Sequence, residues 1–150
     1  IRTRQGWLYL AVMLDLYSRQ VVGWAMSDRN DTKLVSDALM MSKWRRGELK
    51  DVIVHSDQGS TYASGDYRKL LKENNLLCSM SRKGECHDNA VAESFFGSLK
   101  TELADHEDYH TRAEAKQSLF EYIEVFYNRQ RRHSYLGYVS PVEYERASAF

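Results

Sequence analysis

The sequence predicts an α/β fold built around a mixed sheet. Two apolar runs, residues 7–14 and 20–26, flank a short polar stretch, which is typical of an antiparallel hairpin. A short apolar run at residues 52–55 follows a segment with helical periodicity. From there strand-like and helix-like segments alternate, as in α/β domains. The 150 residues, 43% of them hydrophobic, are enough for one domain with its own core.

Local signals then define the elements in order. Residues 30–46 begin with cap-type residues and stop before a glycine, which predicts a helix. Residues 90–103 form the most clearly amphipathic helix. Thr111 and Glu114 form a capping box for a helix that we expect to bury Leu119, Phe120, Ile123, Phe126 and Tyr127. The other predicted elements are a helix over 65–74, a strand over 76–80, and a short helix that starts at Ser140, Pro141 and Glu143.

Composition excludes several classes of protein. Twenty-one basic and 21 acidic residues give a net charge of zero, so bulk charge does not indicate a nucleic-acid partner. Two cysteines are too few for a disulfide framework, and no apolar run is long enough to span a membrane. We therefore expect a cytoplasmic protein without a membrane partner. The first residue is Ile1 rather than Met, and we expect sequence before it.

Asp57 is the first candidate for chemistry. It follows the apolar run at 52–55 and precedes Gly59. In open α/β sheets the ligand site lies beyond the carboxyl ends of the strands, where this run delivers Asp57. The alternative is that Asp57 only caps the next turn, with Gly59 supplying a positive φ. A second acid must decide between them.

Glu93 is the candidate partner. At about 100° per residue it lies roughly 60° outside the apolar arc of its helix, and Lys100 lies within about 20° of it. The alternative is a solvated glutamate with an unrelated lysine. Mg²⁺ is typically held by one or two protein carboxylates together with substrate phosphates, so an acid from a loop and an acid from a helix suit it.

Three motifs make the pairing more specific. Thirty-five residues separate Asp57 from Glu93, and the chain contains "VIVHSDQGSTY", "KGECHDNAVAESFFGSLKTE" and "YIEVFYNRQRRHSYLGYVSP". From about Gln5 to Pro141 the sequence resembles the catalytic core of insertion-sequence transposases of the retroviral-integrase type, the DDE recombinases, and in particular their second-reading-frame product. The resemblance implies an RNase H-like fold in which three acids bind two Mg²⁺ or Mn²⁺ ions for DNA cleavage and strand transfer.

The same resemblance assigns roles to residues. It makes Asp57 and Glu93 the second and third catalytic, metal-binding acids, and Lys100 a contact to terminal DNA. The family's first acid lies on a strand that would end near Ile1, between the second and fourth strands of the sheet. We therefore expect a sheet that lacks its first strand, and a fragment that is inactive alone. Asp15 lies too far along its strand to replace the missing acid, and we expect it to act in the turn before Arg19.

The candidate DNA contacts are mostly basic and lie in two segments. The segment from Asn128 to His133 carries three arginines after a helix end, and residues 81–84 form a basic loop between the two acids. The first segment could also be a solvated basic helix end. The resemblance favours phosphate contacts. The full predicted set is Lys100, Arg82, Lys83, Asn89, Arg129, Arg131, Arg132 and His133.

The resemblance also implies partners and boundaries. DNA sites would be recognised by an upstream helix-turn-helix protein or domain, and the chain would form a homo-oligomer and associate with the bacterial nucleoid. Residues 1–136 would form the catalytic core and residues 137–150 a tail with a short helix.

Three alternatives stay open at this point. The chain could be a noncatalytic DNA-binding or dimerising module with the same fold. It could be a two-carboxylate hydrolase such as a glycosidase. Zinc binding at Cys78, Cys86 and His87 is disfavoured, because their spacing matches no standard zinc pattern.

Overall fold

The structure is a computed structural model that describes residues 1–15, 17–46, 52–55, 69, 72–73, 77–79, 90–133 and 136–148. For residues 52–55, 77–79, 90–93 and 148 it describes the backbone alone. The central sheet has the order β4-β3-β5-β6. Its strands are β3 (Tyr9–Asp15), β4 (Val21–Ser27), β5 (Val52–His55) and β6 (Leu77–Ser79). β3 runs antiparallel to β4 and β5, and β5 runs parallel to β6, so the predicted mixed sheet is confirmed.

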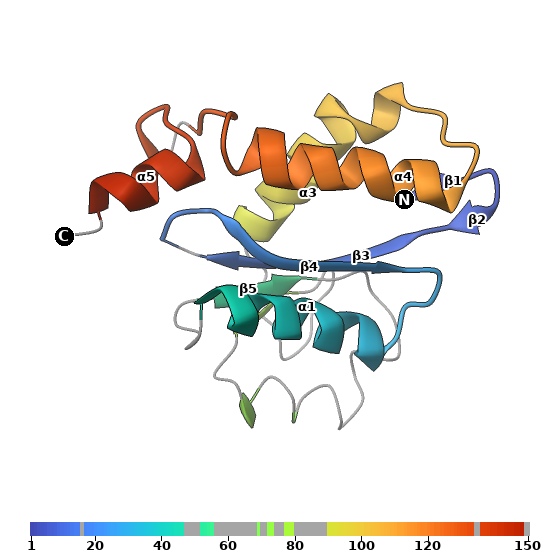
Figure 1. Ribbon diagram of the computed structural model, residues 1–150, viewed down its shortest axis with the longest axis horizontal. Helices are drawn as coiled ribbons and strands as arrows, with labels where there is room; N and C mark the ends of the chain where they lie inside the picture. The colour runs from blue at the N-terminus through green and yellow to red at the C-terminus, as the bar shows by residue number, and fades with distance from the viewer. Residues whose placement is uncertain are drawn as a thin grey trace.

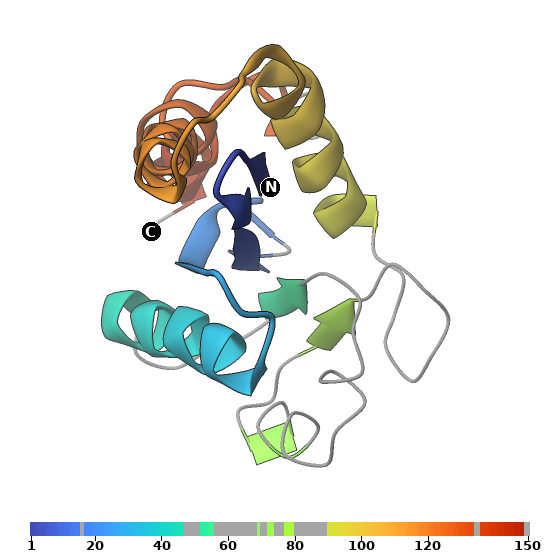
Figure 2. The ribbon, with the colours of Figure 1, turned by 90° about the vertical axis from the view of Figure 1, so that its right-hand side faces the viewer.

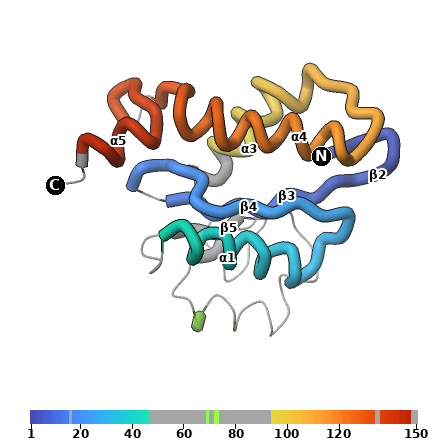
Figure 3. The backbone as a smooth tube through the Cα atoms, in the orientation of Figure 1, coloured from blue at the N-terminus to red at the C-terminus, as the bar shows by residue number. Residues whose placement is uncertain are grey.

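Helices cover both faces of this sheet (Figure 1). One face carries α1 (Thr32–Arg46). The opposite face carries α3 (Ala90–Glu102) and α4 (Arg112–Phe120), and α4 continues into the π-helix η3 (Glu121–Tyr127). Figure 2 shows α1 on one side of the sheet and α3 and α4 on the other. The short 3₁₀ helix η2 (Ala104–His106) follows α3, and α5 (Pro141–Ser148) lies beyond the far end of η3 (Figure 3).

A small hairpin precedes β3 and lies at the end of the molecule opposite α5 (Figure 1). It consists of β1 (Arg2–Thr3) and β2 (Gly6–Trp7). Gly6 has a φ of 123°, a backbone conformation that favours glycine. The Arg4 N–H donates to the Tyr109 carbonyl at 2.9 Å, which fastens the hairpin to the chain before α4.

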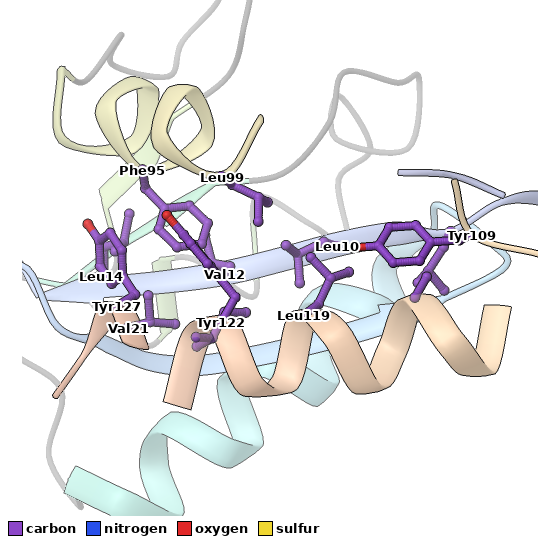
Figure 4. Packing of buried hydrophobic residues seen from close by; sticks show 13 residues of the cluster. Leu10, Val12, Leu14, Val21, Phe95, Leu99, Tyr109, Leu119, Tyr122 and Tyr127 are labelled. Carbon is purple, nitrogen blue, oxygen red and sulfur yellow. The ribbon is translucent and has the colours of Figure 1, made fainter. Parts of the chain in front are cut away.

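The core lies on both faces of β3. Leu10, Val12 and Leu14 point toward α3, α4 and η3, where they pack with Phe95 and other apolar side chains (Figure 4). Met13 is also fully buried, and the Ser42 hydroxyl of α1 lies 2.8 Å from its sulfur. Burial on two faces explains why this strand is apolar without alternation.

α1 rests directly on β4 at Gly23. A β-carbon at this position would lie 2.4 Å from the Ala38 carbonyl oxygen and 2.4 Å from the Ser42 hydroxyl oxygen. Neither atom can move away cheaply, because Ala38 belongs to the helix backbone and Ser42 is buried. Gly23 therefore sets the distance between the helix and the sheet.

Most of the predicted elements are confirmed. The hairpin of 7–14 and 20–26 is β3 and β4, and the predicted strand over 76–80 is β6. Thr111 and Glu114 cap this helix as expected: the Thr111 hydroxyl accepts from the Glu114 N–H at 3.1 Å, and the Glu114 carboxylate accepts from the His110 N–H at 3.0 Å, one residue before the Thr111 N–H of a standard capping box. The Ser140 hydroxyl accepts from the Glu143 N–H at 3.2 Å and caps α5 in the same way. The helix predicted over 65–74 falls largely outside the described residues.

The burial predicted for the helix after the capping box is partly wrong. Leu119, Ile123 and Tyr127 are buried as expected, but Phe120 and Phe126 are 43% and 39% exposed. Phe120 is the last residue of α4 and lies about 100° around the helix from the buried Leu119. After Phe120 the helix changes to π geometry, where the Asn128 N–H reaches back five residues to the Ile123 carbonyl at 3.1 Å. The wider turn alters which side chains face the sheet, and a sequence pattern with an α-helical period does not anticipate it.

The described sheet is continuous between β3 and β5. The resemblance places a further strand between these two, but here Val12 pairs with His55 and Asp15 pairs with Val52. β5 thus ends level with the middle of β3, two residues before Asp57. None of the helices in the described ranges is long and apolar enough to cross a membrane.

Candidate functional site

The two candidate metal ligands are only partly covered by the structure. Asp57 lies outside the described residues, and Glu93 is described by its backbone alone, in the first turn of α3. The start of α3 lies on the same side of the molecule as β5, the strand that precedes Asp57 (Figure 2). Within the described ranges no three His, Cys, Asp or Glu side chains are grouped to hold a metal ion. A cation shared by Asp57 and Glu93 therefore stays a prediction.

The orientation of α3 is set by its buried side chains. Phe95 and Leu99 are fully buried, and the Phe95 ring meets the Tyr127 ring edge-on with centroids 4.9 Å apart. At about 100° per residue, position 93 and Lys100 lie at least roughly 100° around the helix from both buried residues. The Lys100 side chain is exposed, and the described part of the chain gives it no ion pair. α3 thus directs Lys100 away from the core, as a contact to DNA requires.

Three residues of the basic segment after η3 point into the protein. The Asn128 amide is buried and bonds both backbone groups of Val21, accepting from its N–H at 2.8 Å and donating to its carbonyl at 3.0 Å. His133 is buried against Tyr127, whose ring centroid lies 4.7 Å away. Burial lowers the pKa of His133. Asn128 therefore connects the end of η3 to β4, and His133 packs back onto the last residue of η3.

Arg131 is the third inward residue, and it binds Glu102 of α3. Its Nε donates to both carboxylate oxygens of Glu102 at 2.9 Å, and its Nη2 donates to Oε2 at 2.8 Å and to the Ser98 hydroxyl at 3.2 Å. The Tyr122 hydroxyl also donates to Glu102, at 3.0 Å. The hydrogen bond from Arg131 holds the pKa of Glu102 below its usual value. The predicted DNA contact by Arg131 is untested, but its guanidinium already has a partner in the fold.

The other two arginines of this segment have no such partner among the described residues. Arg129 and Arg132 are exposed, and neither makes an ion pair with any residue that the structure describes. Their predicted role as contacts to DNA phosphates stays a prediction. Three further predicted contacts, Arg82, Lys83 and Asn89, lie outside the described residues.

Asp15 has the local role that the sequence predicts. Its Oδ1 accepts from the backbone N–H groups of Tyr17 at 2.8 Å and Ser18 at 3.0 Å, within the turn that leads to Arg19. Its Oδ2 lies 3.3 Å from Nη1 of Arg46 at the end of α1, and the same guanidinium binds Glu145 of α5. Asp15 therefore joins the turn to α1, and Arg46 extends this connection to α5.

The chain matches two sequence profiles of one family. Residues 1–86 match a profile described as an integrase core domain, and residues 93–148 match a second profile with the same description. The chain therefore belongs to the integrase core domain family.

Two of the proteins to which the chain is similar are transposases. Over 145 residues the chain is 52% identical to the transposase InsF for insertion sequence IS3A of Escherichia coli. The aligned residues make up 97% of this chain and 50% of that transposase. Over 146 residues it is 47% identical to the transposase for insertion sequence element IS904 of Lactococcus lactis. The aligned residues make up 97% of this chain and 58% of that transposase. The chain spans about half the length of these relatives.

Sequence reasoning missed Glu102, the carboxylate that orients Arg131. Glu102 is the last residue of α3 and lies 29 positions before Arg131, so no local spacing links the two. The one available signal is that Ser98 and Glu102 are four residues apart and hence on one side of α3, away from Lys100.

Proposed function

We propose that this chain is the catalytic-core part of an insertion-sequence transposase, which cuts DNA strands and joins them to a target in a reaction that depends on divalent cations. The observation that carries the proposal is the 52% identity with a transposase over 145 residues, which includes both segments that contain the candidate acids. The proteins of that comparison are twice as long. The complete reaction is therefore proposed for a longer protein or an assembly that contains these residues.

Asp57 and Glu93 are the proposed ligands of Mg²⁺ or Mn²⁺. Carboxylate oxygens are the ligands that such hard cations prefer, and a loop acid and a helix acid suit a cation that also contacts DNA phosphates. When bound, the cations activate the attacking water or 3′-hydroxyl and stabilise the leaving oxygen. The resemblance places the family's first acid on a strand that would end near Ile1, outside the two acids proposed here. We therefore expect weak cation binding and no turnover from these residues alone.

The exposed basic residues are the proposed phosphate contacts. Lys100 lies on the same side of α3 as position 93, and Arg129 and Arg132 extend from the end of η3. We include Arg82, Lys83 and Asn89 on the strength of the resemblance. Arg131 and His133 are assigned to positioning instead, because both contact other parts of the fold. Contacts to phosphates set affinity without selecting a sequence, so recognition of the element's ends is assigned to a helix-turn-helix partner.

Titration of the chain with Mn²⁺, followed by electron paramagnetic resonance, tests the proposed ligands. Asp57→Asn and Glu93→Gln should each weaken Mn²⁺ binding at least about tenfold, because each removes a charged oxygen ligand. Asp28→Asn is the matched control, since Asp28 is an exposed acid on the loop before α1. Binding that all three variants leave unchanged would contradict the proposal and favour a noncatalytic DNA-binding or dimerising module.

A further inference from the structure

We propose that the cavity between the β1–β2 hairpin and the C-terminal end of α3 binds one unpaired nucleotide of a DNA strand, with its base on Trp7 and its phosphate on Arg2 and Lys100. This inference rests on the proposed function, because it takes DNA as the substrate. It adds a site for a nucleotide that has left the duplex, at the opposite end of α3 from position 93.

The cavity has the size of a small-ligand site. Its volume is about 730 Å³, within the roughly 300 to 1,000 Å³ that is usual for such sites. Arg2 and Trp7 contribute to its wall from the hairpin, Lys100 from α3, and Asp105 and Glu107 from the segment that follows. Residues that are far apart in the sequence thus face one space beside a proposed DNA contact.

Trp7 supplies a surface for a base. Trp7 is 56% exposed, although β3 is buried from Leu10 onward. Arg112 of α4 holds the backbone of Trp7 in place. Its guanidinium donates to the Trp7 carbonyl at 3.2 Å, and its N–H donates to the Gln5 side-chain oxygen at 2.9 Å. Arg4 and Asp108 form an ion pair that fastens the hairpin turn. An exposed indole on a fixed backbone can stack with any base, because every base has an aromatic face.

The charges around the cavity favour one nucleotide over a duplex. Arg2 and Lys100 have no ion-pair partner among the residues that the structure describes, so both are available to a phosphate. Asp105 and Glu107 are acidic and line the same cavity. They repel the continuous phosphates of a duplex, but their oxygens can accept hydrogen bonds from the amino groups of an exposed base. A base with a single phosphate satisfies both kinds of charge.

Fluorescence anisotropy with two labelled DNAs tests this assignment. One DNA is a blunt duplex, and the other is the same duplex with a short single-stranded overhang. Trp7→Ala should weaken binding of the overhang DNA about tenfold and leave the blunt duplex unchanged, because only an unpaired base can stack. Trp44→Ala is the matched control, since Trp44 is 91% exposed on α1, away from the cavity.

Further variants separate recognition from folding. Trp7→Phe keeps an aromatic face and should restore most of the overhang binding, and Arg2→Ala should weaken it as Trp7→Ala does. An equal loss of binding for both DNAs with Trp7→Ala, or no loss for either, would overturn the nucleotide site. In that case, salt-dependent binding of the duplex would still support the proposed function. If the unaltered chain bound neither DNA, both proposals would fail.

Discussion

The segment from Asn128 to His133 has two sides that differ in what they contact. Asn128, Arg131 and His133, the inner set, bond to β4, α3 and the end of η3 respectively. Arg129 and Arg132, the outer set, are exposed and have no ion pair within the described residues. Both sets belong to one basic motif, "NRQRRH". The inner set shapes the fold, and the outer set is available to DNA.

The difference shows that basic residues of one short segment can have different surroundings in the fold. Arg131 and Arg132 are adjacent and chemically identical, yet one guanidinium is held by Glu102 and the other is exposed. Because Glu102 and Ser98 lie on α3, Arg131 also helps to orient the helix that carries Glu93 and Lys100. Changes in the inner set should therefore affect stability, and changes in the outer set should affect DNA affinity.

The largest effect is expected for Asn128→Ala. The substitution leaves the Val21 N–H and carbonyl buried without their partners, which should lower the free energy of unfolding by about 2 to 4 kcal/mol. Urea unfolding monitored by circular dichroism measures it. Gln130→Ala, at an exposed position of the same segment, should change it by less than about 0.5 kcal/mol. Equal effects of the two substitutions would mean that the inner set does not support the fold.

The Arg131–Glu102 pair should contribute less, because both side chains are partly exposed. Arg131→Ala and Glu102→Gln should each cost about 1 kcal/mol, and their effects should not add. A double-mutant cycle in urea measures the coupling, with Arg129→Ala in place of Arg131→Ala as the control. Additive effects for Arg131 and Glu102 would contradict a direct interaction.

His133 should make stability depend on pH. Burial lowers its pKa in the folded protein, so the unfolded chain binds the proton first, near about pH 6.5. Stability should therefore fall as the pH is lowered through that value, until the folded protein also takes up the proton. Thermal melts between pH 7.5 and 5.5 should show a smaller pH dependence for His133→Gln than for the unaltered chain.

Glu102 acts in a lower pH range than His133. Arg131 depresses the folded pKa of Glu102, so its contribution is present above about pH 4.3 and is lost as the pH falls through the depressed value. A steeper loss of stability below pH 4 in the unaltered chain than in Glu102→Gln would agree with this. If His133→Gln removed that loss as well, the two groups would not act in separate ranges.

The smallest effect on stability is expected for the outer set. Arg129→Ala and Arg132→Ala should each change the free energy of unfolding by less than about 0.5 kcal/mol. Each should reduce the slope of log affinity for duplex DNA against log salt concentration by about 0.9, because one phosphate contact is lost. Arg131→Ala should leave that slope unchanged. If Arg131→Ala reduced the slope and the other two substitutions did not, Arg131 would be the phosphate contact in place of Arg129 and Arg132.

The sequence predicted the elements well where the signal is local. The helix cap at Thr111 and the turn around Asp15 depend on residues that are two or three positions apart, and both are present. The π-helical turn of η3 and the Glu102–Arg131 pair were not predictable in this way, since they depend on packing between distant segments. Sequence and family likewise gave the candidate acids, but not how Asp57 and Glu93 lie relative to each other.

The shared cation at Asp57 and Glu93 is the central claim, and paramagnetic broadening of amide signals by Mn²⁺ tests it most directly. The account predicts that the amides around Asp57 and those around Glu93 broaden together, at one Mn²⁺ concentration, and that Asp57→Asn abolishes both effects. Broadening around one acid without the other, or broadening around Glu93 that Asp57→Asn leaves intact, would contradict it.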